Sequence, residues 1–196
     1  MQRFLPANPR RKLLRWITLV KKPIWVDLSF IQKKCISTAW VNSQSLSAVQ
    51  AGEWDRQVIP ISEWLSGPKH QSIRQHFVDA VPWQETPLFR LFEETLHEKG
   101  SRGQFSSLQA LAEYYAHTYD RIFSDLQQNG VQPPSLQRPL IRPLYVHIDR
   151  HGDLMWTTEG NHRFSMLHIL GCKRIPVYLY WQHQQSPCGL ARWRAG

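Results

Sequence analysis

The sequence has no hydrophobic run long enough to cross a membrane. Its longest apolar stretch near the N-terminus, Trp16–Val20, falls far short of the roughly 20 residues that a spanning helix needs. No small-residue cleavage site follows this stretch, so it also lacks the features of a good secretory signal. The sequence therefore predicts a soluble, cytoplasmic protein without a membrane span.

Cysteine is scarce. Cys35, Cys172 and Cys188 are the only cysteines among the 196 residues. Their odd number, their wide spacing and the lack of a C-x-x-C pair exclude a disulfide framework. We therefore expect a reducing compartment.

Several common site motifs are also missing. The sequence contains no G-x-x-x-x-G-K-[ST], no G-x-G-x-x-G and no G-x-S-x-G, so P-loop, Rossmann and hydrolase-elbow sites are not supported. His147, His151 and His183 do not have the spacing of a zinc site. We expect no metal bound directly by a protein cluster.

Positive charge is concentrated at one end of the sequence. The net charge is +9, and residues 1–34 contain nine Lys and Arg against Asp27 alone. The rest of the chain is nearly neutral, which argues against a fold that binds nucleic acid over its whole surface. We interpret residues 1–23 as a basic N-terminal arm. Residues 1–34 could attract nucleic acid weakly and without specificity, or an acidic partner, and the alternative is a solvated tail that aids solubility.

The pattern of apolar residues predicts an α+β fold, with a small mixed β-sheet and helices packed around it. We expect a single domain over residues 24–183, with a helical insertion at about 70–130 and a C-terminal tail at 184–196. The expected strands are 24–28, 58–61, 144–149, 154–157 and 175–181. The expected helices are 71–78, one that follows Thr86 as N-cap and ends at 99–103, 107–129, and 164–170.

The segment Thr158–Arg163 lies between an expected strand and an expected helix. Gly160 permits a sharp turn or the close approach of a ligand. The helix that follows offers unbonded backbone N–H groups and the positive end of its dipole to an anion. His162 and Arg163 add cationic or hydrogen-bonding groups at the same place. These features favour binding of phosphate or another oxyanion.

Two further residues of this segment leave alternatives open. Glu159 could bind a cation or act as a base. Asn161 could instead be an ordinary helix N-cap, with the residues after it packed or paired for structural reasons only. Spacing alone does not decide between the anion site and the capped helix.

The stretch Val146–His183 resembles the ParB/sulfiredoxin-like superfamily. That family has a strand, a (D/E)-G-x-(H/R)-R turn, a helix, Leu-Gly and then Ile-Pro-Val. The similar pieces of this chain are Val146–Leu154, Glu159–Phe164, Leu170–Gly171 and Ile175–Val177. A weaker likeness at Gly52–Asp55 and Trp83–Thr86 resembles a ParB-like branch without a helix-turn-helix domain.

This resemblance implies a phosphate-binding motif at Gly160, Asn161, His162 and Arg163. The equivalent motif binds CTP in partition proteins, binds ATP in sulfiredoxins, and holds nucleotide phosphates in free-serine kinases, where a carboxylate is the base. The chain departs from sulfiredoxins because Asn161 stands where they have a reactive cysteine, so we do not expect reductase activity. No helix-turn-helix pattern follows in this sequence, so we do not expect sequence-specific DNA partition.

Four residues outside this segment are further candidates. Glu85 stands just before a helix and could be a general base or hold Mg²⁺ through water, although a carboxylate there also favours the helix dipole. Trp83, Asp55 and Thr86 are candidates for a substrate pocket, in which the indole would stack on a base or sugar. The alternatives are core packing for Trp83 and a turn role for Asp55.

The sequence therefore predicts a nucleotide-binding protein, with phosphate transfer to a small molecule as the first hypothesis. Gly160–Arg163 would hold the phosphates of ATP, ADP or CTP. Glu85, His162 and Glu159 are the expected catalytic residues, with Mg²⁺ held through Glu85 or Glu159. Nucleotide hydrolysis is a close relative of this hypothesis. The alternatives are a non-catalytic module that senses a nucleotide or phosphosugar, and a nucleic-acid binder that uses the basic arm.

Overall fold

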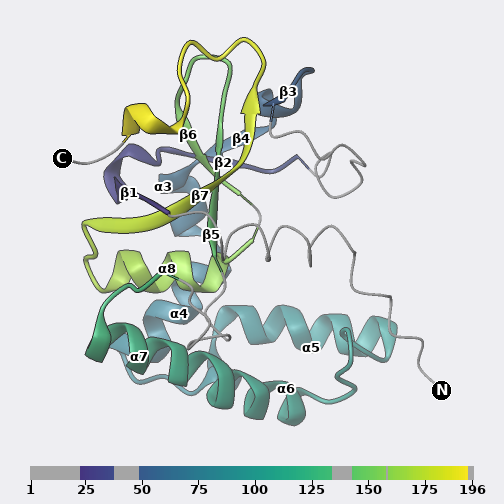
Figure 1. Cartoon of the computed structure of the whole chain (residues 1–196). Helices are drawn as coiled ribbons and strands as arrows, with labels where there is room; N and C mark the ends of the chain where they lie inside the picture. Colours follow the sequence, from purple (N-terminus) through teal and green to yellow (C-terminus); the bar gives the residue numbers. More distant parts are fainter. Residues whose placement is uncertain (1–22, 38–48, 134–142, 158, 194–196) are drawn as a thin grey trace. The chain divides into compact units, whose positions relative to one another are not determined.

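The computed structural model describes residues 23–37, 49–133, 143–157 and 159–193 (Figure 1). Residues 1–22 of the expected basic arm, with the apolar stretch Trp16–Val20, lie outside this part. Contacts divide the chain into two compact units. The sheet unit takes the described residues up to 60 together with those of 131–160 and 173–193, and the helical unit takes 61–130 and 161–172.

The sheet unit contains one mixed sheet of seven strands among its described residues. The strands are β1 (Ile24–Asp27), β2 (Lys33–Cys35), β3 (Val49–Gln50), β4 (Val58–Pro60), β5 (Leu144–Ile148), β6 (Leu154–Trp156) and β7 (Arg174–His183). Their spatial order is β1-β7-β5-β6-β2-β4, and β3 pairs with the end of β7. The pairs β5–β7, β2–β6 and β3–β7 are parallel and the other pairs are antiparallel.

A tight turn joins β5 to β6 at the centre of this sheet. Asp149 organises the turn, because its Oδ1 accepts hydrogen bonds from the backbone N–H groups of His151 (2.9 Å) and Asp153 (2.8 Å). Gly152 has a φ of +89°, a conformation that favours glycine. Every residue of β5 is buried, as expected for a strand with neighbours on both sides.

Strand β2 was not predicted, and it makes the sheet larger than expected. Two of its three residues, Lys33 and Lys34, are lysines, a residue type that is depleted in strands. In the structure Lys33 Nζ forms ion pairs with Asp149 (2.7 Å) and Asp153 (2.8 Å) of the β5–β6 turn. Strand β2 also pairs with β4 on one side and with β6 on the other. The ion pairs and the strand pairing together keep this charged tripeptide in the sheet.

The helical unit contains all of the described α-helices. These are α3 (Ile61–Ser66), α4 (Pro68–Val78), α5 (Pro87–Lys99), α6 (Leu108–Tyr115), α7 (Arg121–Asn129) and α8 (Asn161–Ile169). Shorter helical turns are η3 (Trp83–Glu85) and η4 (Ala116–Asp120) in this unit, and η1 (Leu28–Phe30), η2 (Trp54–Arg56) and η5 (Leu190–Trp193) in the sheet unit. The observed mixed sheet and separate helices confirm the prediction at the level of the α+β class.

The start of α5 confirms Thr86 as the residue before the helix, but its side chain has another role. Thr86 is buried, and its Oγ1 donates to the backbone oxygen of Trp83 (2.7 Å). The N–H of Leu88 donates instead to Oγ of Ser72 in α4 (2.8 Å). The first turn of α5 is therefore capped by a neighbouring helix, which ties α4 to α5.

The segment expected as one helix over 107–129 is interrupted by a π-helical turn. Figure 1 shows α6, η4 and α7 as one continuous rod, in which η4 is the π segment. The wider turn lets Tyr115 and Tyr119 both contact His162 of α8, with ring centroids 5.4 Å and 4.0 Å from the imidazole. π turns of this kind are often found at functional sites.

No helix in residues 23–37, 49–133, 143–157 and 159–193 combines the length and the apolar character that a membrane crossing requires. At the other end of the chain, in the expected tail, Trp193 packs on Phe30 with ring centroids 5.2 Å apart. Its Nε1 donates to the backbone oxygen of Gly152 (3.1 Å).

Candidate functional site

Helix α8 begins earlier than predicted, immediately after the turn that follows β6. Gly160 has a φ of +70° and Asn161 is the first residue of the helix. Asn161 is thus helical and is not the N-cap that the alternative prediction assumed. The first turn of α8 has no acidic residue, and its leading N–H groups have no acceptor within the helix. The chain therefore presents the positive end of a nine-residue helix directly after a glycine.

His162 lies in an aromatic setting of the helical unit. Its Nε2 shares a hydrogen bond with the hydroxyl of Tyr115 (3.0 Å), and its ring stacks on Tyr119 at an interplanar angle of 20°. Burial lowers the pKa of His162 to about 3, and the positive charges of Lys69 and Arg102 lower it further in the same direction. The imidazole is therefore neutral at physiological pH. This corrects the expectation that His162 contributes a positive charge to a phosphate.

Lys69 and Arg102 are two cations of the helical unit that the sequence analysis missed. Lys69 lies in the first turn of α4, and burial lowers its pKa, as does the charge of Arg102. The guanidinium of Arg102 lies 4.0 Å above the ring of Phe92. Within the described ranges, neither side chain has an ion pair with a carboxylate. No sequence motif marks these residues, because their proximity depends on how α4, α5 and α8 pack.

In the sheet unit, a buried lysine holds the beginning of the turn that leads to Gly160. Lys34 Nζ donates to the backbone oxygen of Thr157 (3.0 Å), and both residues are buried. The Oγ1 of Thr157 accepts from the N–H of Glu159 (3.2 Å). The parallel pairing of β2 with β6 places Lys34 opposite Trp156, the last residue of β6, so the ammonium reaches the residue that follows the strand. Thr158 lies outside the described residues.

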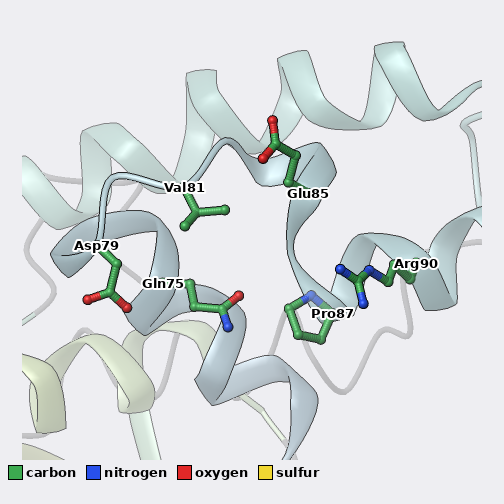
Figure 2. A pocket seen from close by; sticks show the side chains of 6 residues that line it. All are labelled: Gln75, Asp79, Val81, Glu85, Pro87 and Arg90. Carbon is green, nitrogen blue, oxygen red and sulfur yellow. The ribbon is translucent and has the colours of Figure 1, made fainter.

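Glu85 lies on the surface, beside an open hollow of about 550 Å³. The hollow is lined by Gln75, Asp79, Val81, Glu85, Pro87 and Arg90 (Figure 2). Figure 2 shows Glu85 on η3 and Arg90 on the following helix, α5. None of residues 159–163 lines this hollow. The described contacts therefore do not bring Glu85 together with the candidate phosphate turn.

Trp83 is part of the core of the helical unit. Only 3% of it is exposed, and its ring stacks on His76 with centroids 4.1 Å apart. Its Nε1 donates to Oδ1 of Asp120 (3.0 Å). The same core includes Ile73, Leu88, Phe89, Phe92, Leu111, Ala112, Tyr115 and Met166. Trp83 and the buried Thr86 are thus packing residues, which corrects their expected place in a substrate pocket.

Asp55 is buried in an ion pair of the sheet unit. Its Oδ2 accepts from the backbone N–H (3.0 Å) and from Nε (2.9 Å) of Arg150, and its Oδ1 accepts from Nη2 (2.7 Å). Burial by itself would raise the pKa of Asp55, but the hydrogen bonds from Arg150 outweigh it and lower the pKa to about 2. Asp55 fixes the β5–β6 turn to η2 and is not available as a substrate-binding carboxylate.

His147, one of the three histidines examined for a metal site, is fully buried on β5. It packs between Trp54 and Trp181, with ring centroids 5.2 Å and 6.0 Å away. Neither ring nitrogen has a hydrogen-bond partner. Burial lowers the pKa of His147 to about 3. Across the described part of the chain, no group of three or more His, Cys, Asp or Glu side chains could hold a metal ion.

Comparisons with known proteins identify no relative of this chain. No family model, no curated protein and no solved structure matches it. The candidate function is therefore argued from the geometry and charge of the site itself.

Proposed function

We propose that this protein binds a phosphorylated small molecule, most simply a nucleotide, at Gly160 and the first turn of α8. The observation that carries the proposal is that α8 starts directly after a positive-φ glycine and has no acidic residue in its first turn. A helix start without an acidic residue in its first turn favours the binding of an anion. The resemblance of residues 146–183 to the ParB/sulfiredoxin-like superfamily supports the same ligand class.

Each part of the turn has a role in this proposal. Gly160 has no Cβ, so a phosphate oxygen can approach its backbone closely. The N–H groups of Asn161, His162 and Arg163 supply donors at the helix start, and the Arg163 guanidinium supplies a positive charge. Lys34, which binds the oxygen of Thr157, keeps the beginning of the turn in one conformation. The neutral His162 serves as a packed support and not as a cation.

The proposal is limited to binding. Phosphate transfer or nucleotide hydrolysis would also need a positioned carboxylate base and Mg²⁺, held through Glu85 or Glu159 in our prediction. Glu85 belongs to a hollow that residues 159–163 do not line. The nucleic-acid alternative depends on residues 1–34, of which 1–22 lie outside the described part. Binding of a phosphorylated ligand is therefore the function that the site supports best.

Thermal unfolding in the presence of ATP, ADP, CTP or orthophosphate, with and without Mg²⁺, tests this proposal. A ligand at about 100 times its Kd stabilises the folded protein by about 2.7 kcal/mol, which corresponds to a Tm increase of roughly 5–10 °C for a chain of this size. Gly160→Ala is expected to weaken binding at least tenfold, because its Cβ enters the turn at a φ of +70°.

Gly171→Ala is the matched control. Gly171 also has a positive φ, +64°, but it follows the opposite end of α8. The backbone strain of the two variants is therefore comparable, and both are expected to lower the Tm of the ligand-free protein. Only Gly160→Ala should lose the ligand-induced increase. The absence of any increase in the unmodified protein with all four ligands would refute the proposed function.

A further inference from the structure

The core of the sheet unit contains a histidine that is not used by any described hydrogen bond. His147 is fully buried on β5, and neither Nδ1 nor Nε2 has a partner among the described residues. A neutral imidazole has one nitrogen with a free lone pair, and to bury such an acceptor without a donor is costly. The rings that contact it, those of Trp54 and Trp181, also have unpartnered Nε1 atoms. His147 thus presents an unused nitrogen ligand inside the core.

The strand register places two sulfur-containing side chains on the same face of the sheet as His147. His147 lies directly opposite Met155 of β6, and Met155 lies opposite Lys33 of β2. Residues paired across strands share a face, and so do residues two apart in one strand. Cys35, two residues after Lys33 in β2, therefore belongs to this face. The neighbouring strands β5, β6 and β2 each contribute one of the three side chains.

The packing of this face agrees with the register. Cys35 and Met155 belong to one buried cluster that also contains Trp54 and Trp181. The Sγ of Cys35 lies 3.8 Å from the backbone oxygen of Trp54, and the ring of Trp54 lies 5.2 Å from that of His147. None of the three side chains is more than 1% exposed. An imidazole, a thiol and a thioether therefore share one apolar interior.

These three groups form a soft ligand set. Thiolate and thioether sulfur favour Cu(I), and imidazole nitrogen also binds copper. Zinc instead takes Cys, His and carboxylate ligands, and the described residues contain no group of three or more His, Cys, Asp or Glu that could hold an ion. A monovalent ion on a Cys35 thiolate adds no net charge to the core, whereas a divalent ion would leave one positive charge uncompensated.

We infer that Cys35, His147 and Met155 bind one Cu(I) ion on this face of the sheet unit. The Cys35 thiol releases its proton to solvent as its sulfur binds the ion, and His147 and Met155 each contribute a lone pair. Copper remains Cu(I), so no oxidant or reductant takes part. The ion links β2, β6 and β5 and thereby stabilises the sheet unit. This inference is independent of the proposed phosphate site at the start of α8.

Anaerobic titration of the full chain with Cu(I), in competition with the Cu(I) chelator bicinchoninate, tests the site. Because the three ligands are buried, copper is offered both to the native protein and during refolding from urea. We expect one tightly bound ion per chain and a higher Tm of the loaded protein. X-ray absorption at the copper edge should show nitrogen together with sulfur ligands. Binding through the thiols of Cys172 or Cys188 alone would show sulfur only.

Met155→Leu is the most informative variant, because it removes the sulfur and nearly preserves the volume of the side chain. It should weaken Cu(I) binding at least tenfold, as should His147→Phe. The matched control is Met166→Leu, which makes the same change at a fully buried methionine of the helical unit and should leave the affinity within about twofold. Cys35→Ser should abolish the tight site, and Cys188→Ser should retain it.

Three outcomes would overturn the inference: neither preparation retains copper against the chelator, the absorption spectrum shows sulfur ligands alone, or Met155→Leu and Met166→Leu bind Cu(I) equally. The ligands read from the absorption spectrum of the unmodified protein decide the matter if a variant fails to fold. Binding of phosphate or nucleotide is measured separately, and none of these outcomes changes the proposed function.

Discussion

Replacement of Asp55 by alanine is expected to destabilise the protein by roughly 2–4 kcal/mol, because it breaks a buried ion pair from one side. The side chain of Asp55 is 2% exposed and that of Arg150 is 14% exposed. The substitution removes the acceptors of three hydrogen bonds from Arg150, one of which comes from its backbone N–H. The Arg150 donors would then have no acceptor at a largely buried position, and the free-energy cost of removing them from water would no longer be compensated. Urea unfolding at neutral pH measures the loss.

Glu53 provides the control for this experiment. It contacts the same guanidinium, with Oε2 3.2 Å from Nη2 of Arg150, but its side chain is 64% exposed. Glu53→Ala is therefore expected to cost less than about 1 kcal/mol. Equal effects of the two substitutions would contradict the view that burial sets the strength of this pair.

The pH dependence of the Asp55 pair follows from the direction of its shift. The pKa of Asp55 falls from 3.8 to about 2 on folding. The stabilisation from this pair is therefore complete above about pH 4 and is lost as the pH falls towards 2. Any loss of stability at milder acidity must come from other groups.

Acidification from pH 6.5 to 4.5 is expected to destabilise the protein strongly through its buried histidines. The pKa of His147 and that of His162 are both lowered by burial from 6.5 to about 3. In this pH window the unfolded chain binds protons that the folded protein excludes, so stability falls as the pH decreases. Two pH units correspond to about 2–3 kcal/mol for the fully buried His147 alone. Urea unfolding at a series of pH values measures the slope.

Substitution by an aromatic residue without a titrating group isolates the contribution of each histidine. His147→Phe and His162→Phe should each reduce the slope of stability against pH by up to one proton between pH 6.5 and 4.5. His97 is exposed at the end of α5, so His97→Gln is the control and should leave the slope unchanged. A slope in the double variant His147→Phe/His162→Phe equal to that of the unmodified protein would show that other groups cause the acid sensitivity.

The elements that the sequence predicted are those whose signals are local. Apolar residues at helical spacing located the cores of α5 and α6, and alternating or continuous apolar residues located β5 and β7. Strand β2 escaped prediction because its two lysines are stabilised by partners more than a hundred positions away, Asp149 and Asp153 for Lys33 and the oxygen of Thr157 for Lys34. Strand propensity reflects such neighbours more than the strand's own residues.

At the candidate site, too, the sequence predicted the features that are local and missed those that depend on residues distant in the chain. Gly160 and the helix after it are contiguous, so the sequence could predict a turn that leads into a helix start. The charge state of His162 was not predictable, since it depends on burial against Tyr115 and Tyr119. Trp83 was misassigned for the related reason that an indole in a helix-flanking loop has the same sequence signature whether it is buried or exposed. Lys69 and Arg102 were missed because no sequence motif marks either residue.

The division of the chain between its two units also constrains how the protein can be made. Each unit is assembled from separated stretches of sequence, since the helical unit needs 161–172 in addition to 61–130, and Met166 from that second stretch completes its core. Strand β7 supplies pairing partners for β1, β3 and β5. During translation, α3 to α7 therefore leave the ribosome with an uncovered apolar surface that awaits α8, and the sheet awaits β7. The helical unit can therefore close only after residue 172 has emerged, and the sheet only after β7 has emerged up to His183.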